Sequence, residues 1–392
     1  MIKDASVFTN SYFPTTIRHR EKQIKDLEYQ ILGPLTQKLM RNSIIYGVAG
    51  TGKTLTVRYV ADQLKTSKNV QVWYIKLREA RTEYSAINTV GKALGLGDQK
   101  GHTDTKIYSS IYEYILKMSQ KHFLFILDEV QNIKQDCNSF LDFFLRPEEN
   151  CNLGEKKISV VFISNKITYP QNLDAGMQSS FACIDKLIFP PYNANQLRDI
   201  LNERTAAGLY ENTYESTVIP LCAAYAAQEH GDARRAIQML GIAAAIAEKE
   251  SAQKITEEHI KKARETIEFE GAANIIRTLP GQGKAVVLAI ARDIKARKKK
   301  GDTELPTTGT IYIQYNNIVT IIGIDKLTQR RVTDILIEFE EMGLVSTALI
   351  FKGRMGRWKT VDLNYPVEII EKAVTEDVRF EEFKPIIIQS KL

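Results

Sequence analysis

Residues 47–54 read Gly-Val-Ala-Gly-Thr-Gly-Lys-Thr and match GxxxxGK[ST], the pattern of a phosphate-binding loop. Glycines at this spacing let backbone N–H groups curl around a phosphate, Lys53 brings a positive charge to the outer phosphates, and the Thr54 hydroxyl can ligate Mg²⁺. A short apolar run at 43–46 precedes the loop and a helix-forming run at 54–65 follows it, which is the context that the motif requires. The predicted phosphate-binding residues are Gly47, Val48, Ala49, Gly50, Thr51, Gly52, Lys53 and Thr54.

Two polar groups follow apolar runs further along the chain. Residues 123–127 are apolar and end in Asp128 and Glu129, and residues 160–164 lead to Asn165. Beside a phosphate-binding loop, Asp128 is expected to hold Mg²⁺, partly through water, and Glu129 to orient or deprotonate an attacking water. Asn165 is expected to help position that water. Solvated acids at a strand end and a plain asparagine turn are the structural alternatives.

The order of the predicted elements indicates the fold. Strand candidates at 43–46, 70–75, 123–127 and 158–164 alternate with helix candidates at 54–65, 82–94 and 104–120, which predicts a parallel sheet covered on both faces. Residues 193–269 are helix-forming without a strand candidate, and the Gly- and Pro-containing segment 271–283 reads as a second boundary. Segment 310–322 is ambiguous, because its β-branched composition favours a strand and its apolar spacing favours a helix.

Composition excludes several classes of protein. The 392 residues are 44% hydrophobic and 26% charged, which is typical of a globular protein of two or three domains. No apolar run approaches the roughly 18–20 residues of a membrane span, and the N-terminus does not read as a signal peptide. The four cysteines form no CxxC pair, which favours a reducing compartment. Residues 281–364 hold 14 Lys+Arg against 9 Asp+Glu, so +5 of the net charge of +6 lies there, as expected of a nucleic-acid-binding domain.

In this order the motifs resemble those of AAA+ ATPases, and more closely those of the archaeal replication initiators related to the eukaryotic origin recognition complex and its cell-division-control loader. The resemblance covers roughly residues 12–365. Besides the segments above, it rests on His19-Arg20-Glu21, Ser179-Ser180, Phe189-Pro-Pro-Tyr192, Gly231-Asp-Ala-Arg234, Leu327-Thr-Gln-Arg-Arg-Val-Thr-Asp334 and Gly353-Arg-Met-Gly-Arg357.

The resemblance implies an α/β AAA+ P-loop domain with a parallel sheet at 1–188, a helical lid domain at 189–272 and a C-terminal winged-helix DNA-binding domain at 273–392. It implies ATP or ADP with Mg²⁺ between the first two, with Tyr192 and Arg234 among the cofactor-binding residues. Arg234 matches the lid arginine that reaches the γ-phosphate and is therefore also a catalytic candidate. A surface arginine at 234 or 235 is the alternative.

One departure from the family pattern affects catalysis. Where the family reads roughly L-D-P-R-V-K-S-S, this chain reads Leu173-Asp-Ala-Gly-Met-Gln-Ser-Ser180, so Gly176 replaces the arginine that is a candidate finger for a neighbouring subunit's ATP. Gln178 replaces the lysine. We therefore expect the protein to be a poor activator of its own copies.

A second constellation indicates DNA binding. Residues 327–344 predict a helix with Val332, Ile335, Leu336, Phe339 and Met342 on its core face. The opposite face, near the N-terminus, suits a major groove. The predicted DNA-binding residues are Gln329, Arg330 and Thr333 of this helix, Lys352, Arg354 and Arg357 of a glycine-containing wing with Lys359 beside them, and Arg78 and Arg81 of the helical insertion implied at 78–96. A basic hairpin on a protein-binding winged helix is the alternative.

The sequence thus predicts an ATP-dependent initiator that recognises double-stranded origin DNA, with slow hydrolysis as a conformational switch. A nucleotide-bound regulator or accessory paralogue that does not hydrolyse ATP is the alternative, and a clamp loader or transposition helper is a more distant one. The resemblance implies a paralogous initiator subunit and a replicative helicase as partners, no membrane, and a cytoplasmic, nucleoid-associated location.

Overall fold

The computed structural model describes residues 1–31, 41–133, 137–351 and 357–383. The chain divides into two compact units, Met1–Ile260 and Lys261–Leu392. Each unit is described separately below. Within the described residues, none of the helices combines the length and the apolar character that a membrane crossing requires.

The first unit is built on a five-stranded parallel sheet of order β2-β3-β4-β1-β5. The strands are β1 (Ser43–Tyr46), β2 (Val70–Lys76), β3 (His122–Asp128), β4 (Lys157–Ser164) and β5 (Asp185–Ile188). The four predicted strands are confirmed, and β5 was not predicted because it has only four residues, of which two are charged and only Leu187 is buried. This strand order puts the ends of β1, β3 and β4, where the phosphate loop, Asp128 and Asn165 follow, side by side.

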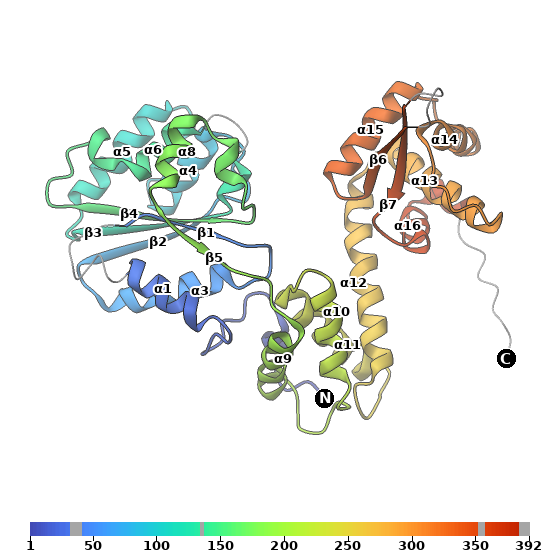
Figure 1. The fold of residues 1–392 in the computed structure, drawn as a ribbon, viewed down its shortest axis with the longest axis horizontal. Coiled ribbons are helices and arrows are strands. Elements are labelled where there is room, and N and C mark those ends of the chain that lie inside the picture. The colour runs from blue at the N-terminus through green and yellow to red at the C-terminus, as the bar shows by residue number, and fades with distance from the viewer. Residues whose placement is uncertain (32–40, 134–136, 352–356, 384–392) are drawn as a thin grey trace. The chain divides into compact units, whose positions relative to one another are not determined.

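Helices cover both faces of this sheet (Figure 1). One face carries α1 (Glu21–Ile31) and α3 (Lys53–Asp62), followed by η2 (Gln63–Thr66), and the other carries α4 (Glu83–Ala93), α5 (Asp104–Lys117), α6 (Asn138–Leu145) and α8 (Ala175–Ala182). Shorter helical turns are η3 (Val130–Asn132), α7 (Pro147–Asn150) and η4 (Tyr169–Asn172). The predicted helices 54–65, 82–94 and 104–120 correspond to α3, α4 and α5, which end one to three residues earlier.

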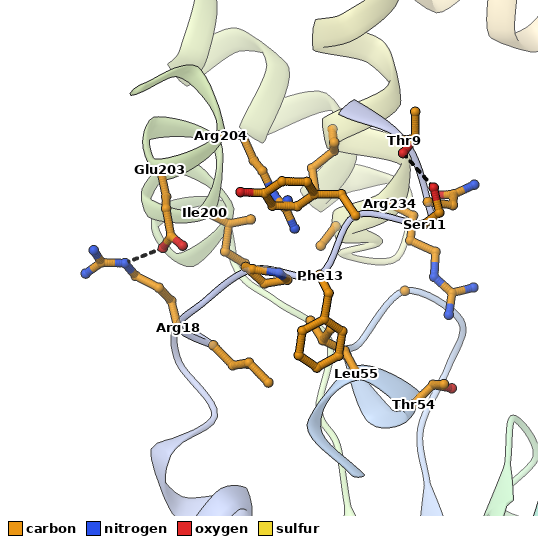
Figure 2. A pocket seen from close by; sticks show the side chains of 18 of the residues that line it. Thr9, Ser11, Phe13, Arg18, Thr54, Leu55, Ile200, Glu203, Arg204 and Arg234 are labelled. Atoms are coloured by element: carbon orange, nitrogen blue, oxygen red, sulfur yellow. Dashed lines mark hydrogen bonds and ion pairs between the residues drawn. The ribbon is translucent and has the colours of Figure 1, made fainter. Parts of the chain in front are cut away.

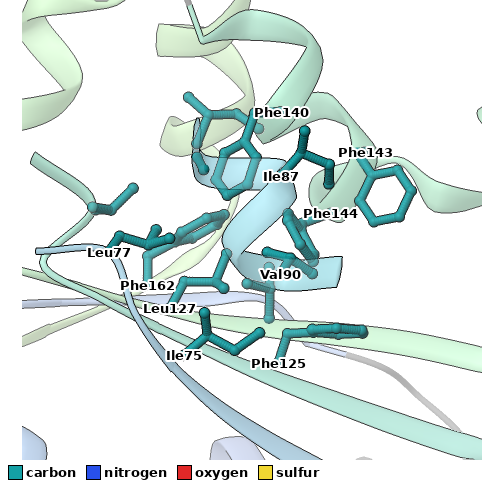
Figure 3. Packing of buried hydrophobic residues seen from close by; sticks show 14 of the residues in the cluster. Ile75, Leu77, Ile87, Val90, Phe125, Leu127, Phe140, Phe143, Phe144 and Phe162 are labelled. Atoms are coloured by element: carbon teal, nitrogen blue, oxygen red, sulfur yellow. The ribbon is translucent and has the colours of Figure 1, made fainter. Parts of the chain in front are cut away.

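Two hydrophobic layers hold the sheet between its helices. On the α4–α6 side, Phe125, Leu127 and Phe162 of the strands lie under Val90 of α4 and Phe144 of α6 (Figure 3). On the other side, strand residues pack against α1 and α3 in a second buried cluster. Because both faces are buried, the strands read as continuous apolar runs rather than as alternating ones, which is why they could be predicted.

The lid part of the first unit consists of α9 (Ala194–Gly208), α10 (Val218–Gln228) and α11 (Ala233–Lys249). Residues 1–18, which we call the N-terminal strap and which include η1 (Ala5–Phe8), contact these helices. The Lys3 amide donates to Gly208 O at 2.8 Å, and Phe8 lies so close to Gly208 and Gly241 that an added Cβ would meet it at 2.6 or 2.7 Å. The strap is therefore anchored to the lid, although it precedes the sheet in sequence.

Within the described residues, the winged-helix part of the second unit has three helices and then a hairpin, in the order of a winged helix, with a further helix after the hairpin. Its elements are α13 (Gly281–Lys299), α14 (Thr308–Ile322), α15 (Gln329–Glu341), β6 (Val345–Phe351), β7 (Arg357–Leu363), α16 (Val367–Val374) and η6 (Val378–Phe383). The ambiguous segment 310–322 is helical, because Ile311, Tyr315, Ile318 and Val319 are buried along one face. The hairpin β6–β7 is antiparallel, with Val345 opposite Leu363.

Helix α12 (Glu257–Thr278) runs through Gly271, where Ala272, Ala273 and Ile276 are buried, and ends two residues before α13, within the segment 271–283 that was predicted as a boundary. One local prediction was wrong in this part of the chain. Met342 is 45% exposed instead of lying on the core face. The helix has ended at Glu341, and Gly343 at φ +73° turns the chain away.

Candidate functional site

The phosphate-binding loop follows β1 and leads into α3, as predicted. Gly50 and Gly52 have φ of +73° and +85°, a conformation that side chains with a Cβ rarely adopt. Lys53 is buried, and its Nζ donates to Gly47 O and Val48 O, both at 2.7 Å. The ammonium therefore lies inside the loop, where it can exchange these carbonyl acceptors for a phosphate oxygen. The donor set of this loop fits a nucleotide.

Arg20 and Tyr192 pack against each other, and Arg20 bonds to the phosphate-binding loop. The Arg20 guanidinium lies 3.7 Å from the centroid of the Tyr192 ring, and it donates to Thr51 O at 3.0 Å and Pro190 O at 2.7 Å. Burial lowers the pKa of Arg20 and raises that of Tyr192. Tyr192, predicted to contact the cofactor, lines the pocket described next. The resemblance included Arg20, but its role as a brace between loop and lid became visible only in the structure.

A pocket of about 460 Å³ opens beside the loop. Its walls come from the strap, the loop, α3 and the two lid helices α9 and α11 (Figure 2). Phe13, Leu55 and Ile200 supply apolar surface, and Thr54 and Arg234 lie at the polar side. Apolar side chains beside a phosphate-binding loop can accommodate the base of a nucleotide.

The strap is the part of this pocket that sequence reasoning missed. Arg18 Nε donates to Glu203 Oε2 at 2.8 Å, and Arg204 lies over the Tyr12 ring at 4.4 Å. These contacts fix the strap to α9 on one side of the cavity. The only sequence signal was a cluster of aromatic and apolar residues at 12–17, which has no periodicity and no motif.

The predicted magnesium ligands are brought together. Asp128 Oδ2 accepts hydrogen bonds from Thr54 Oγ1 and from the Tyr74 hydroxyl, each at 2.7 Å. Asp128 is buried and Thr54 is half-buried at the edge of the pocket. A carboxylate and a hydroxyl in contact beside a phosphate loop fit a magnesium site completed by water and phosphate oxygens. Among the described residues, no group of three His, Cys, Asp or Glu side chains offers an all-protein metal site.

Glu129 and Asn165 follow neighbouring strands. Glu129 has φ +63°, and its carboxylate accepts from Asn132 Nδ2 at 3.1 Å and lies 3.7 Å from Lys76 Nζ. Asn165 is exposed at the end of β4, and its backbone N–H donates to Gln131 Oε1 at 3.2 Å. Gln131 was not among the predicted site residues, yet this bond links the segments that follow β3 and β4.

The lid contributes Arg234 through the start of α11. Asp232 caps this helix by accepting from the Arg234 and Arg235 backbone N–H groups, and it lies against Gly50 of the loop. Arg234 is exposed and lines the pocket, as Thr54 of the phosphate loop does. Arg235 pairs with Glu229 instead. The geometry thus distinguishes Arg234 from its neighbour.

The pKa of Lys53 predicts a pH dependence of nucleotide binding. Burial lowers this pKa to about 8, despite the opposing charge of Asp128. A bound phosphate stabilises the ammonium and raises the pKa, so binding takes up a proton once the free site has lost it. We therefore expect affinity to be flat below pH 8 and to fall by up to about tenfold per pH unit above it. Calorimetry at pH 8.5 in two buffers of different ionisation enthalpy should show proton uptake, and its absence would contradict this assignment.

Gly176 and Gln178 lie in the first turns of α8. Asp174 caps the helix by accepting from the Met177 N–H at 2.7 Å, and Gln178 Nε2 donates to Leu173 O at 2.8 Å. Gly176 is exposed, and a Cβ built there meets nothing closer than Asp174 Oδ1 at 3.5 Å. The position therefore has room for the arginine that the family pattern carries.

The structure describes only part of the predicted DNA-binding set. Gln329 and Arg330 are exposed in the first turn of α15, and Thr333 is half-buried with its hydroxyl donating to Gln329 O at 3.0 Å. Lys352 and Arg354 lie outside the described residues, as does the side chain of Arg357, whose backbone begins β7. Lys359 lies 3.6 Å from Glu340. In the first unit, Arg78 and Arg81 are both exposed.

Three family models match the chain in succession. An AAA domain matches residues 38–166, the Cdc6 AAA+ ATPase-type lid domain matches 198–265, and the CDC6 C-terminal winged helix domain matches 274–373. The matched ranges follow the order of the sheet, the lid helices and the winged-helix elements described above.

Curated relatives and solved structures extend this likeness over the whole chain. An ORC1-type DNA replication protein of Thermococcus kodakarensis is 34% identical, in an alignment that covers 100% of this chain and 94% of the relative's length. ORC1-type DNA replication protein 1 of Methanosarcina acetivorans is 35% identical over 99% of this chain and 92% of its own. The Aeropyrum pernix ORC1 protein, solved in complex with DNA, is 28% identical with a TM-score of 0.82, covering 97% of this chain and 98% of its own.

Proposed function

Since this chain belongs to the family of ORC1-type DNA replication proteins, we propose that it is an initiator that binds origin duplex DNA under the control of a bound nucleotide. We place the nucleotide-binding domain at 1–188, the lid at 189–272 and the DNA-binding winged helix at 273–392. A nucleotide between the first two would set the angle between them, and slow hydrolysis would reset it.

Helix α15 carries the proposal for DNA. Its buried face of Val332, Ile335, Leu336 and Phe339 fixes it to the core, while Gln329 and Arg330 stay exposed at its N-terminus. A helix held in this way, after a turn and before a basic hairpin, can insert its first turn into a major groove. The concentration of positive charge at 281–364 supports the same assignment. The relative from Aeropyrum pernix was itself solved with DNA.

Exchanging Arg330 for alanine tests which face of α15 meets the bases. A bidentate contact between arginine and guanine is worth about 1–3 kcal/mol, so Arg330→Ala should weaken binding to a selected site by roughly 5- to 150-fold. Arg331 is the matched control, because its guanidinium pairs with Glu338 at 3.6 Å and Asp334 at 3.8 Å. Fluorescence anisotropy on one duplex measures both variants, and equal losses would contradict the proposed orientation.

At the nucleotide we propose a division of roles. Lys53 and Arg234 would contact the outer phosphates, Thr54 and Asp128 would hold Mg²⁺, and Glu129 would orient the attacking water with Asn165. Bound Mg²⁺ would neutralise phosphate charge. The Glu129 carboxylate contacts Asn132 and Lys76 in this structure, and we propose that it leaves these partners when it orients the water. This is consistent with a slow ATPase.

Two further assignments rest on the family. Arg78 and Arg81, both exposed, are proposed as a second DNA contact from the AAA+ domain. A paralogous initiator subunit and a replicative helicase are proposed as partners, with a nucleoid-associated location in the cytoplasm.

The second candidate function is a regulator that keeps its nucleotide without hydrolysing it. Gly176 and Gln178 make this function more plausible for this chain than for a typical member of the family. Phosphate release, measured with and without DNA, separates the two. A complete absence of turnover under both conditions would favour the regulator.

A further inference from the structure

The carboxylate of Asp128 has a second hydroxyl partner that the roles above leave unexplained. Thr54 Oγ1 and the Tyr74 hydroxyl both donate to the same oxygen, Oδ2, at 2.7 Å. Thr54 belongs to the phosphate loop, whereas Tyr74 comes from β2. In the register of the two strands, Lys76 lies opposite Asp128 and Tyr74 opposite Ile126. Tyr74 therefore reaches across the sheet along the same face that carries the Asp128 side chain.

Two donors on one oxygen restrict how the carboxylate can turn. A buried aspartate with a single donor can still rotate about its Cβ–Cγ bond, and its second oxygen then points in several directions. With Oδ2 fixed from two sides, Oδ1 keeps one direction and is left to accept from a metal-bound water.

The Tyr74 ring is itself held by a residue of the nucleotide pocket. The guanidinium carbon of Arg58, on α3, lies 5.4 Å from the centroid of the Tyr74 ring and 5.8 Å from that of Phe13. Both Arg58 and Phe13 line the pocket. A chain of contacts thus runs from the strap through Arg58 and Tyr74 to Asp128.

From this geometry we propose that Tyr74 is a positioning residue. Its hydroxyl holds the Asp128 carboxylate in the orientation that binds Mg²⁺, and the bound Mg²⁺ then strengthens nucleotide binding. The proposal rests on the proposed nucleotide and Mg²⁺ site. It assigns no contact between Tyr74 and the metal or the nucleotide, because the hydroxyl acts only through the carboxylate.

The test replaces Tyr74 with phenylalanine in the full chain, which removes the hydroxyl and keeps the ring under Arg58. A fluorescent ADP analogue is titrated in EDTA and then at increasing Mg²⁺. We expect affinity in EDTA to stay within about twofold, because Asp128 does not contact the nucleotide without metal. The Mg²⁺ concentration for half of the affinity gain should rise by roughly 10- to 100-fold, the usual cost of losing such a partner.

Two controls separate positioning from a general effect on folding. Tyr112→Phe removes another buried tyrosine hydroxyl, one that donates to Phe143 O at 3.5 Å on α6, and should leave the Mg²⁺ midpoint unchanged. In an Asp128→Ala background, Tyr74→Phe should shift the midpoint no further, because the side chain that accepts the Tyr74 hydrogen bond is gone.

An unchanged midpoint in Tyr74→Phe would overturn the proposal. So would an equal loss of affinity in EDTA and in Mg²⁺, which would mean that Tyr74 only stabilises the fold. If the unmodified protein binds no nucleotide in either condition, the proposed nucleotide site itself fails, and this outcome is seen before any variant is made.

Discussion

Replacing Lys53 with alanine should weaken nucleotide binding by roughly two to four orders of magnitude. The Lys53 ammonium is buried inside the phosphate loop on Gly47 O and Val48 O, and a phosphate would take over part of this coordination. Removing one partner of a buried, hydrogen-bonded charge pair costs about 3–5 kcal/mol, which corresponds to roughly a 150- to 5,000-fold loss of affinity. Equilibrium titration of a fluorescent ADP measures it directly.

The control for this variant is Lys92→Ala. Lys92 is a lysine of α4 that pairs with Asp98 at 3.2 Å near the surface, and its removal should leave affinity unchanged. The Lys53→Ala protein should remain folded, because a buried cation with a lowered pKa does not stabilise the empty site. Nucleotide affinity within about threefold of the unmodified protein would contradict the assignment of the loop.

Restoring an arginine at position 176 should make ATP turnover depend on protein concentration. We expect turnover per subunit of the unmodified protein to stay constant as concentration rises, since Gly176 offers no group to a neighbouring site. In Gly176→Arg it should rise by at least about tenfold, a small part of the roughly 10³–10⁵ that an arginine finger supplies. The exposed helix position has space for the side chain. Phosphate release across a concentration series gives the result.

Ala175→Arg is the matched control, because it adds the same charge at the adjacent exposed position of α8. It should not confer concentration dependence, since one residue along a helix turns the side chain by about 100°. If turnover per subunit of the unmodified protein rises steeply with protein concentration, the prediction that its copies do not activate one another is wrong.

The sequence predicted those features that are encoded locally. The phosphate loop, Asp128 and Asn165 each follow a buried apolar strand, and the motif order was enough to place them at one edge of a sheet. The helix 329–341 was predictable from the spacing of Val332, Leu336 and Phe339. These features depend on neighbours in sequence, or on a strand order that few topologies allow.

What could not be predicted depends on contacts between distant segments. The strap lines the pocket because it contacts lid residues far along the chain, as Phe8 does where it packs against Gly208 and Gly241. Tyr74 reads as one more β-former in a strand, and its bond to Asp128 needs the register of β2 against β3. Similarly, Gln131 accepts from the Asn165 N–H, a contact between segments that are distant in sequence.

The central claim is that this protein recognises particular duplex sites, and one experiment addresses it most directly. The purified protein is incubated with fragmented host genomic DNA at about 0.15 M salt, where long-range contacts between exposed charges are screened, and the retained fragments are sequenced. We expect enrichment at a few discrete loci that share a short motif, and loss of that enrichment in Arg330→Ala. Uniform retention that disappears as salt rises would contradict the claim, because it would mean that the winged helix supplies only nonspecific phosphate contacts.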